Sequence, residues 1–72
     1  MSREIEMLKR IAKEHASELE EKMKDPQYKM MIDRDSCISK LSIILDTTYL
    51  KTSALFDKEV KRYQDILRRN NF

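Results

Sequence analysis

The amino-acid sequence predicts an all-α protein, and three observations carry that prediction. The 72 residues include no glycine and one proline, whereas average usage would supply roughly five glycines. Apolar residues recur at the spacing of amphipathic helices in both halves of the chain. Ser2, Asp25–Pro26 and Asp33–Ser36 supply helix starts where these patterns begin or change. Without glycine for tight turns, we expect long helices joined by few connections.

The first helix is expected from about residue 3 to residue 24. Ser2 can cap it, and Glu4 and Glu6 favour the positive end of the helix dipole. The helix should end before Pro26, because a residue that precedes proline is pushed out of the helical region. The apolar arc of this helix is made of Ile5, Leu8, Ile11, Ala12, His15, Ala16, Leu19 and Met23.

A short helical connector is expected over residues 26–32, with Asp25 as its cap and Pro26 at its first position. From Ser36 onward a second apolar stripe keeps one phase, which predicts a single helix over residues 36–69, about 50 Å long. Thr47 and Thr48 are poor helix formers, so a break near Asp46–Thr48 is the alternative. The stripe comprises Ile38, Leu41, Ile44, Leu45, Thr48, Tyr49, Thr52, Leu55, Phe56, Val60, Tyr63, Ile66 and Leu67.

Together these elements predict one small domain over residues 1–72, a helical hairpin in which the shorter first helix packs antiparallel on the longer second one. The first helix cannot cover its partner, so two copies are expected to assemble into a homodimeric helical bundle. The expected contacts with another chain are Leu55, Phe56, Val60, Tyr63 and Leu67. A second apolar face, made of Ile43, Leu50 and Ala54, is expected to meet another chain or the connector.

Composition excludes several classes of function. One cysteine, Cys37, allows no intrachain disulfide, and with His15 as the only histidine the chain lacks the ligands for a structural zinc site. The acidic run from Asp33 to Ser36 lacks the glycine and the glutamate of a calcium loop and is interpreted as helix caps. No apolar stretch is long enough to span a bilayer, so a cytoplasmic protein without membrane contact is expected.

Catalysis is not expected either. A single histidine provides no trio of nucleophile, base and orienting group, and phosphate-binding loops need glycine. We therefore expect no enzyme, no cofactor, no metal and no small-molecule substrate.

The second helix carries a basic face on the side away from its apolar stripe. Asp57 and Asp65 dilute this face, which could bind phosphates or an acidic protein surface. Cations near a helix C-terminus also satisfy the helix dipole, which is the simpler explanation. The basic face consists of Lys51, Lys58, Lys61, Arg62, Arg68 and Arg69, with Lys40 further toward the N-terminus.

A helix-turn-helix unit is an alternative for the same segment. Cys37–Leu45 would be its first helix, Asp46–Tyr49 its turn and Leu50–Val60 its recognition helix. Lys51, Thr52 and Ser53 would then lie near base edges. The turn lacks its frequent glycine, and the apolar phase runs through it, which favours the single helix.

The leading hypothesis is a non-catalytic protein–protein interaction module, a small helical regulator or adaptor that acts as an oligomer. The alternative is a dimeric nucleic-acid-binding regulator that uses the basic face of the C-terminal helix. A third hypothesis is a structural subunit whose hairpin repeats into a larger assembly.

Overall fold

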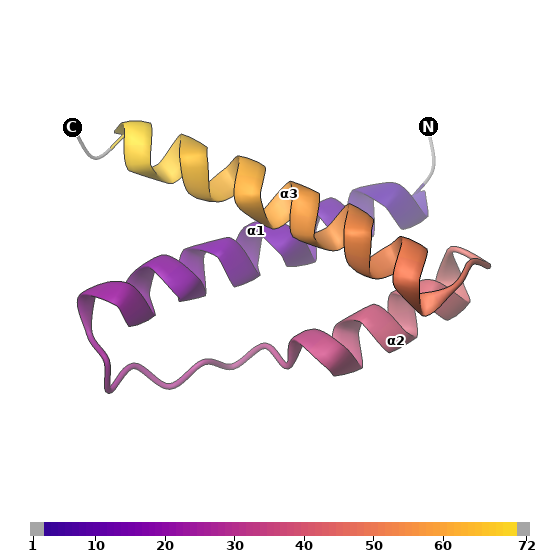
Figure 1. Cartoon of the computed structure of the whole chain (residues 1–72), viewed down its shortest axis with the longest axis horizontal. Helices are drawn as coiled ribbons and strands as arrows, with labels where there is room; N and C mark the ends of the chain where they lie inside the picture. The colour runs from indigo at the N-terminus through magenta and orange to yellow at the C-terminus, as the bar shows by residue number, and fades with distance from the viewer. Residues whose placement is uncertain (1–2, 71–72) are drawn as a thin grey trace.

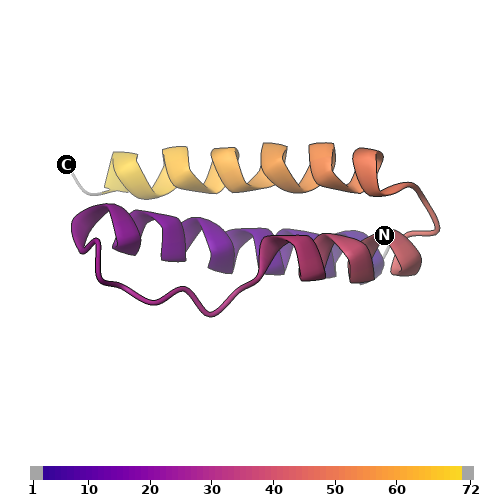
Figure 2. The same ribbon diagram turned by 60° about the horizontal axis from the view of Figure 1, so that its bottom comes forward.

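The computed structural model describes residues 3–70 and contains three helices, α1 (Arg3–Lys24), α2 (Arg34–Ile44) and α3 (Tyr49–Asn70). The all-α prediction is confirmed for these residues, which include no strand. Helices α1 and α2 run in opposite directions in one layer, and α3 lies across them as a second layer (Figures 1 and 2). The expected hairpin of two helices is therefore a bundle of three.

Helix α1 has the predicted bounds, and its charges explain its ends. Glu4 and Glu6 lie in its first turn, whereas Lys22 and Lys24 lie in its last turn, so both ends complement the helix dipole. The expected cap Ser2 lies outside the described residues. The N–H of Asp25 still donates to the carbonyl of Glu21 at 2.9 Å, and the helix stops at the proline that follows.

The prediction of a helical connector over residues 26–32 is wrong. Pro26 and Gln27 form a turn, and the chain from Tyr28 to Asp33 is not helical. The carboxylate of Glu18 on α1 accepts the N–H groups of Met31 at 2.8 Å and Ile32 at 3.1 Å. These hydrogen bonds replace those of a helix. An extended connector also covers more distance per residue, which it needs to return along α1 to the start of α2 (Figure 2).

The prediction of one helix over residues 36–69 is also wrong, because the chain reverses direction at Leu45–Thr48. Asp46 has a left-handed backbone with φ of 54°. The N–H of Asp46 donates to the carbonyl of Ile43 at 3.2 Å, and the N–H of Thr47 donates to that of Ser42 at 3.0 Å. This pair of bonds is a Schellman motif, with Asp46 at the position that glycine usually occupies.

Helix α3 begins immediately after this turn. The hydroxyl of Thr48 accepts the N–H of Lys51 at 3.2 Å and so caps the new helix. Leu45 and Thr52, on either side of the break, are seven residues apart, which is close to two helical turns. Each helix turns its own apolar stripe toward the core, so the apolar phase in the sequence continues although the helix does not. The continuity of that phase therefore could not distinguish one helix from two.

All three helices contribute to the core, and α3 packs chiefly on α1. Ala12 and Ala16 are fully buried on α1, and such small side chains allow a close approach of the crossing helix. The side chain of Phe56 from α3 is also fully buried. The buried apolar residues are Leu8, Ala12, Ala16, Ile38, Leu41, Phe56 and Val60, with Ile11, Leu19, Leu45 and Tyr63 packed around them.

The chain therefore hides most of its apolar stripe by folding α3 back over α1 and α2. A hairpin of two helices would leave this stripe exposed and so favour a homodimer, whereas the three helices cover most of the stripe within one chain. Assembly into a homodimer stays a prediction that needs another surface.

A pair of substitutions at Asp46 tests the turn. Asp46→Gly should give a protein more stable than Asp46→Ala by about 1 kcal/mol, because only glycine adopts the left-handed region without steric cost. The free energies of unfolding, measured by urea denaturation followed by circular dichroism, give the difference. A continuous helix would reverse the order, with alanine favoured over glycine by about 1 kcal/mol.

Candidate functional site

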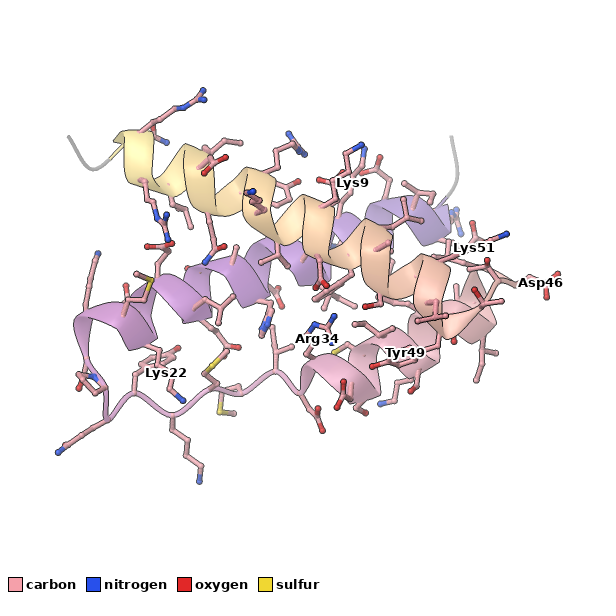
Figure 3. The ribbon with its side chains drawn as sticks, viewed as in Figure 1. Lys9, Lys22, Arg34, Asp46, Tyr49 and Lys51 are labelled. Carbon is pink, nitrogen blue, oxygen red and sulfur yellow. The ribbon has the colours of Figure 1, made fainter. Side chains whose placement is uncertain are left out.

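The outer side of α3 carries the most concentrated charge of one sign on any of the three helices. This helix has six Lys or Arg residues and three Asp or Glu residues, which leaves a net charge of +3. All six cations of the predicted basic face are exposed. No other described element covers this side of α3 (Figure 2), and Lys51 points away from the other two helices (Figure 3).

Two of these cations are held by neighbouring groups. The guanidinium of Arg62 donates to Glu59 at 2.9 Å and lies 4.7 Å from the ring centroid of Tyr63. Its hydrogen bond to Glu59 raises the pKa of Arg62. Arg68 donates to Glu20 of α1 at 3.1 Å. The remaining four, Lys51, Lys58, Lys61 and Arg69, take part in none of the ion pairs formed among residues 3–70.

Asp57, one of the two acids expected to dilute the basic face, forms an ion pair with Arg34 of α2. Arg34 donates to both carboxylate oxygens of Asp57, at 3.1 and 2.8 Å, and to the hydroxyl of Ser53 at 2.7 Å. Figure 3 shows the Arg34 side chain reaching from α2 toward α3. The hydrogen bond that Arg34 donates to Asp57 raises the pKa of Arg34. Asp65 alone remains as an unpaired acid among the exposed basic residues of α3.

A second polar contact joins the same two helices. The hydroxyl of Tyr49, at the start of α3, donates to Asp35 of α2 at 2.7 Å, and this bond raises the pKa of Tyr49. Sequence reasoning did not identify Arg34, Asp35 or Tyr49 as partners of each other or of Asp57. These contacts join residues that are 14 and 23 positions apart, and they depend on the reversal at Asp46. No local motif in the sequence marks them.

The structure buries some of the residues that were expected to contact another chain and exposes others. Phe56 and Val60 lie in the core with 0% and 7% of their surface exposed, so neither presents a surface to a partner. Tyr63 and Leu67 are half-buried, and Leu55 is 44% exposed. The residues of the second apolar face, Ile43, Leu50 and Ala54, are all exposed.

That second face is not continuous. Ile43 and Leu50 are each 81% exposed, but Ile43 belongs to α2 and Leu50 to α3. Their spacing of seven residues would align them on one helix, and the turn between them removes that alignment. Leu50 and Ala54 lie on the same side of α3 as Lys58 and Lys61, since all four face away from Phe56.

Neither His15 nor Cys37 forms part of a reactive cluster. His15 is 6% exposed, its ring centroid lies 5.8 Å from that of Phe56, and its Nδ1 atom is buried without a hydrogen-bond partner. Burial raises the pKa of the Cys37 thiol, which disfavours the reactive thiolate. Residues 3–70 contain no group of three His, Cys, Asp or Glu side chains placed to hold a metal ion. None of α1, α2 and α3 has the length and apolar character needed to cross a membrane.

The buried histidine makes stability depend on pH. Desolvation lowers the pKa of His15 below its usual 6.5, which outweighs the opposing effect of Glu18. As the pH falls below about 6.5, the unfolded chain binds a proton that the folded chain resists, so the free energy of unfolding should decrease. Urea denaturation between about pH 5 and pH 8 measures this. The variant His15→Leu should lose less stability over the same range, and equal losses would contradict the assignment.

Comparison with known proteins adds no family to this description. No protein-family model, no curated protein and no solved structure matches the chain.

Proposed function

We propose that this chain is a non-catalytic binding module that recognises nucleic acid through the basic face of α3. The observation that carries the proposal is the set of four exposed cations Lys51, Lys58, Lys61 and Arg69. None of them pairs with an acid among residues 3–70, and no described element covers their side of α3 (Figure 2). Exposed cations on one side of a helix can neutralise phosphates along a nucleic-acid backbone.

The helix dipole explains only part of this charge. Arg68 and Arg69 lie in the last turn of α3, where cations are favourable without any ligand. Lys51 instead lies in the first turn, which contains no acid, and there the dipole opposes a cation. Lys58 and Lys61 lie in the middle of the helix, beyond the reach of either end. The helix dipole does not account for these three lysines, whereas a phosphate-bearing partner would.

Binding to a duplex DNA fragment tests the proposal. The affinity should fall steeply as the salt concentration rises, with a logarithmic slope of about −0.9 for each phosphate contacted. The double variant Lys58→Gln/Lys61→Gln should bind more weakly and should reduce the size of that slope by about 2. Fluorescence anisotropy over a salt series gives both quantities.

A matched control uses two exposed lysines at the far end of α1. The variant Lys22→Gln/Lys24→Gln removes the same charge from the chain but leaves α3 intact, so its salt slope should match that of the unaltered protein. Absence of binding to any nucleic acid at about 50 mM salt would refute the proposal. Equal effects of the two double variants would mean that net charge, and no particular face, controls binding.

A second candidate function, self-association as a protein–protein interaction module, is favoured by the outer side of α2. Ile38 and Leu41 of this helix face the core, yet Ile43 is 81% exposed and Ile44 is 44% exposed. A helix that is apolar on two sides is typical of one that contacts a further chain. Two copies that place Ile43 and Ile44 against each other would bury these side chains.

Analytical ultracentrifugation over a range of micromolar concentrations tests this second function. If α2 mediates association, the unaltered chain should show a concentration-dependent dimer, and Ile43→Ser should shift it to monomer with a change in unfolding free energy within about 0.5 kcal/mol. Met31→Ser, at an exposed connector position, serves as the control. A monomer at every concentration would exclude the homodimer.

A further inference from the structure

We propose that α2, the turn and α3 act as a helix-turn-helix unit that inserts the first half of α3 into the major groove of duplex DNA. This inference rests on the proposed function and names the form of nucleic acid and the residues that meet it. It also changes the set of residues expected at the bases.

The backbone of this unit has the required parts. Leu45–Thr48 is a connection of four residues, and helix-turn-helix motifs join their helices by three or four residues that often include glycine. Asp46 supplies the left-handed conformation that glycine would supply. After the turn, α3 diverges from α2 and crosses over α1 (Figure 1), so its outer side stands clear of both.

Side-chain contacts hold the two helices in this relation. Arg34 of α2 forms a bidentate ion pair with Asp57 of α3, and the hydroxyl of Tyr49 bonds to Asp35. At the start of α3, the fully buried Thr52 donates its hydroxyl proton to the carbonyl of the capping residue Thr48 at 2.9 Å, which fixes the first turn of the helix. A binding helix that is fixed on its scaffold in this way needs little ordering when it meets a ligand.

The exposed side chains on the outer side of the first half of α3 are of the size and charge that can enter the major groove of DNA. Leu50, Lys51, Ala54 and Lys58 are exposed there, with Lys61 on the following turn. The small side chain of Ala54 lies among longer ones, which lets the helix backbone approach the base pairs within a groove about 12 Å wide. The lysines can reach phosphates or guanine acceptors, and Leu50 and Ala54 can contact thymine methyl groups.

Two residues named in the sequence-based helix-turn-helix alternative are not available. Thr52 is fully buried, and the hydroxyl of Ser53 accepts a hydrogen bond from Arg34. Of the three residues expected at base edges, only Lys51 is exposed and able to contact a base. Leu50, Ala54 and Lys58 are exposed on the same side of α3 and join it in the proposed contact.

The same surface does not suit single-stranded nucleic acid. Proteins that bind unpaired strands stack the bases on exposed aromatic rings. Tyr63 is half-buried beneath the guanidinium of Arg62. Tyr49 is 39% exposed, but it is seven residues from Phe56 and so lies on the core side of α3, away from the exposed lysines. Phe56 is fully buried. The described part of α3 therefore offers cations without a stacking platform, which favours a duplex.

Anisotropy with the full chain tests this inference against a duplex of mixed sequence and against one of its strands alone. Duplex binding should be stronger. Ala54→Phe places bulk at the groove without altering charge, and it should weaken duplex binding by about tenfold while binding to the single strand changes little. Ser17→Phe, at an exposed position of α1, is the matched control and should leave both affinities unchanged. Circular dichroism verifies that both variants remain folded.

A second variant keeps the test independent of Ala54. Leu50→Ser should reduce the preference for duplexes rich in A·T pairs over those rich in G·C pairs, since it removes the contact to thymine methyl groups. Equal affinity for duplex and single strand, or an Ala54→Phe variant that binds duplex normally, would overturn the major-groove inference and leave the proposed function standing. Binding to an acidic polypeptide but to no nucleic acid would overturn both.

Discussion

The reversal of the chain at Leu45–Thr48 determines how the other elements are arranged. Asp46 adopts a left-handed backbone, and two hydrogen bonds back to Ser42 and Ile43 close the end of α2. Because the chain turns there, α3 packs over α1 and α2, and Phe56 enters the core of its own chain. A rod in place of this turn would expose the apolar side of α3. The turn thus allows a chain of 72 residues to bury its core without a second copy.

Polar contacts between helices divide the charges of α3 into two groups. Arg34 and Glu20, from α2 and α1, pair with Asp57 and Arg68 and thereby fix α3 in place. The lysines along the outer side of α3 are left without such partners. Of the acids on the described part of α3, Asp57 pairs with Arg34 and Glu59 pairs with Arg62, so Asp65 alone lies unpaired near these lysines. The positive surface is therefore a product of the tertiary fold and exceeds what the nearly balanced composition suggests.

The parts of the fold that depend on local signals could be predicted from the sequence. The bounds of α1 follow from its acidic first turn, its basic last turn and Pro26, and the exposure of the basic residues follows from helical periodicity. The connector could not be predicted, because its conformation depends on the carboxylate of Glu18, 13 and 14 residues away from its two donors. The sequence indicates the break near Asp46–Thr48 only as the alternative to a single helix, because seven-residue spacing keeps the same apolar phase in one helix or two. The burial of Phe56 and Val60 against the other helices depends on that break, so the sequence did not predict it.

The short link between α2 and α3 also bears on the order of folding. Contacts between these two helices close a loop of only a few residues, which costs little chain entropy. Contacts between α1 and α3 close a much longer loop, which runs from Asp25 to Thr48 and costs more chain entropy. We expect α2 and α3 to form the folding nucleus and α1 to dock on them afterwards. Ala12 and Ala16 of α1 would then pack into the core last. The part of the chain proposed to recognise DNA would then also be the first to acquire its native shape.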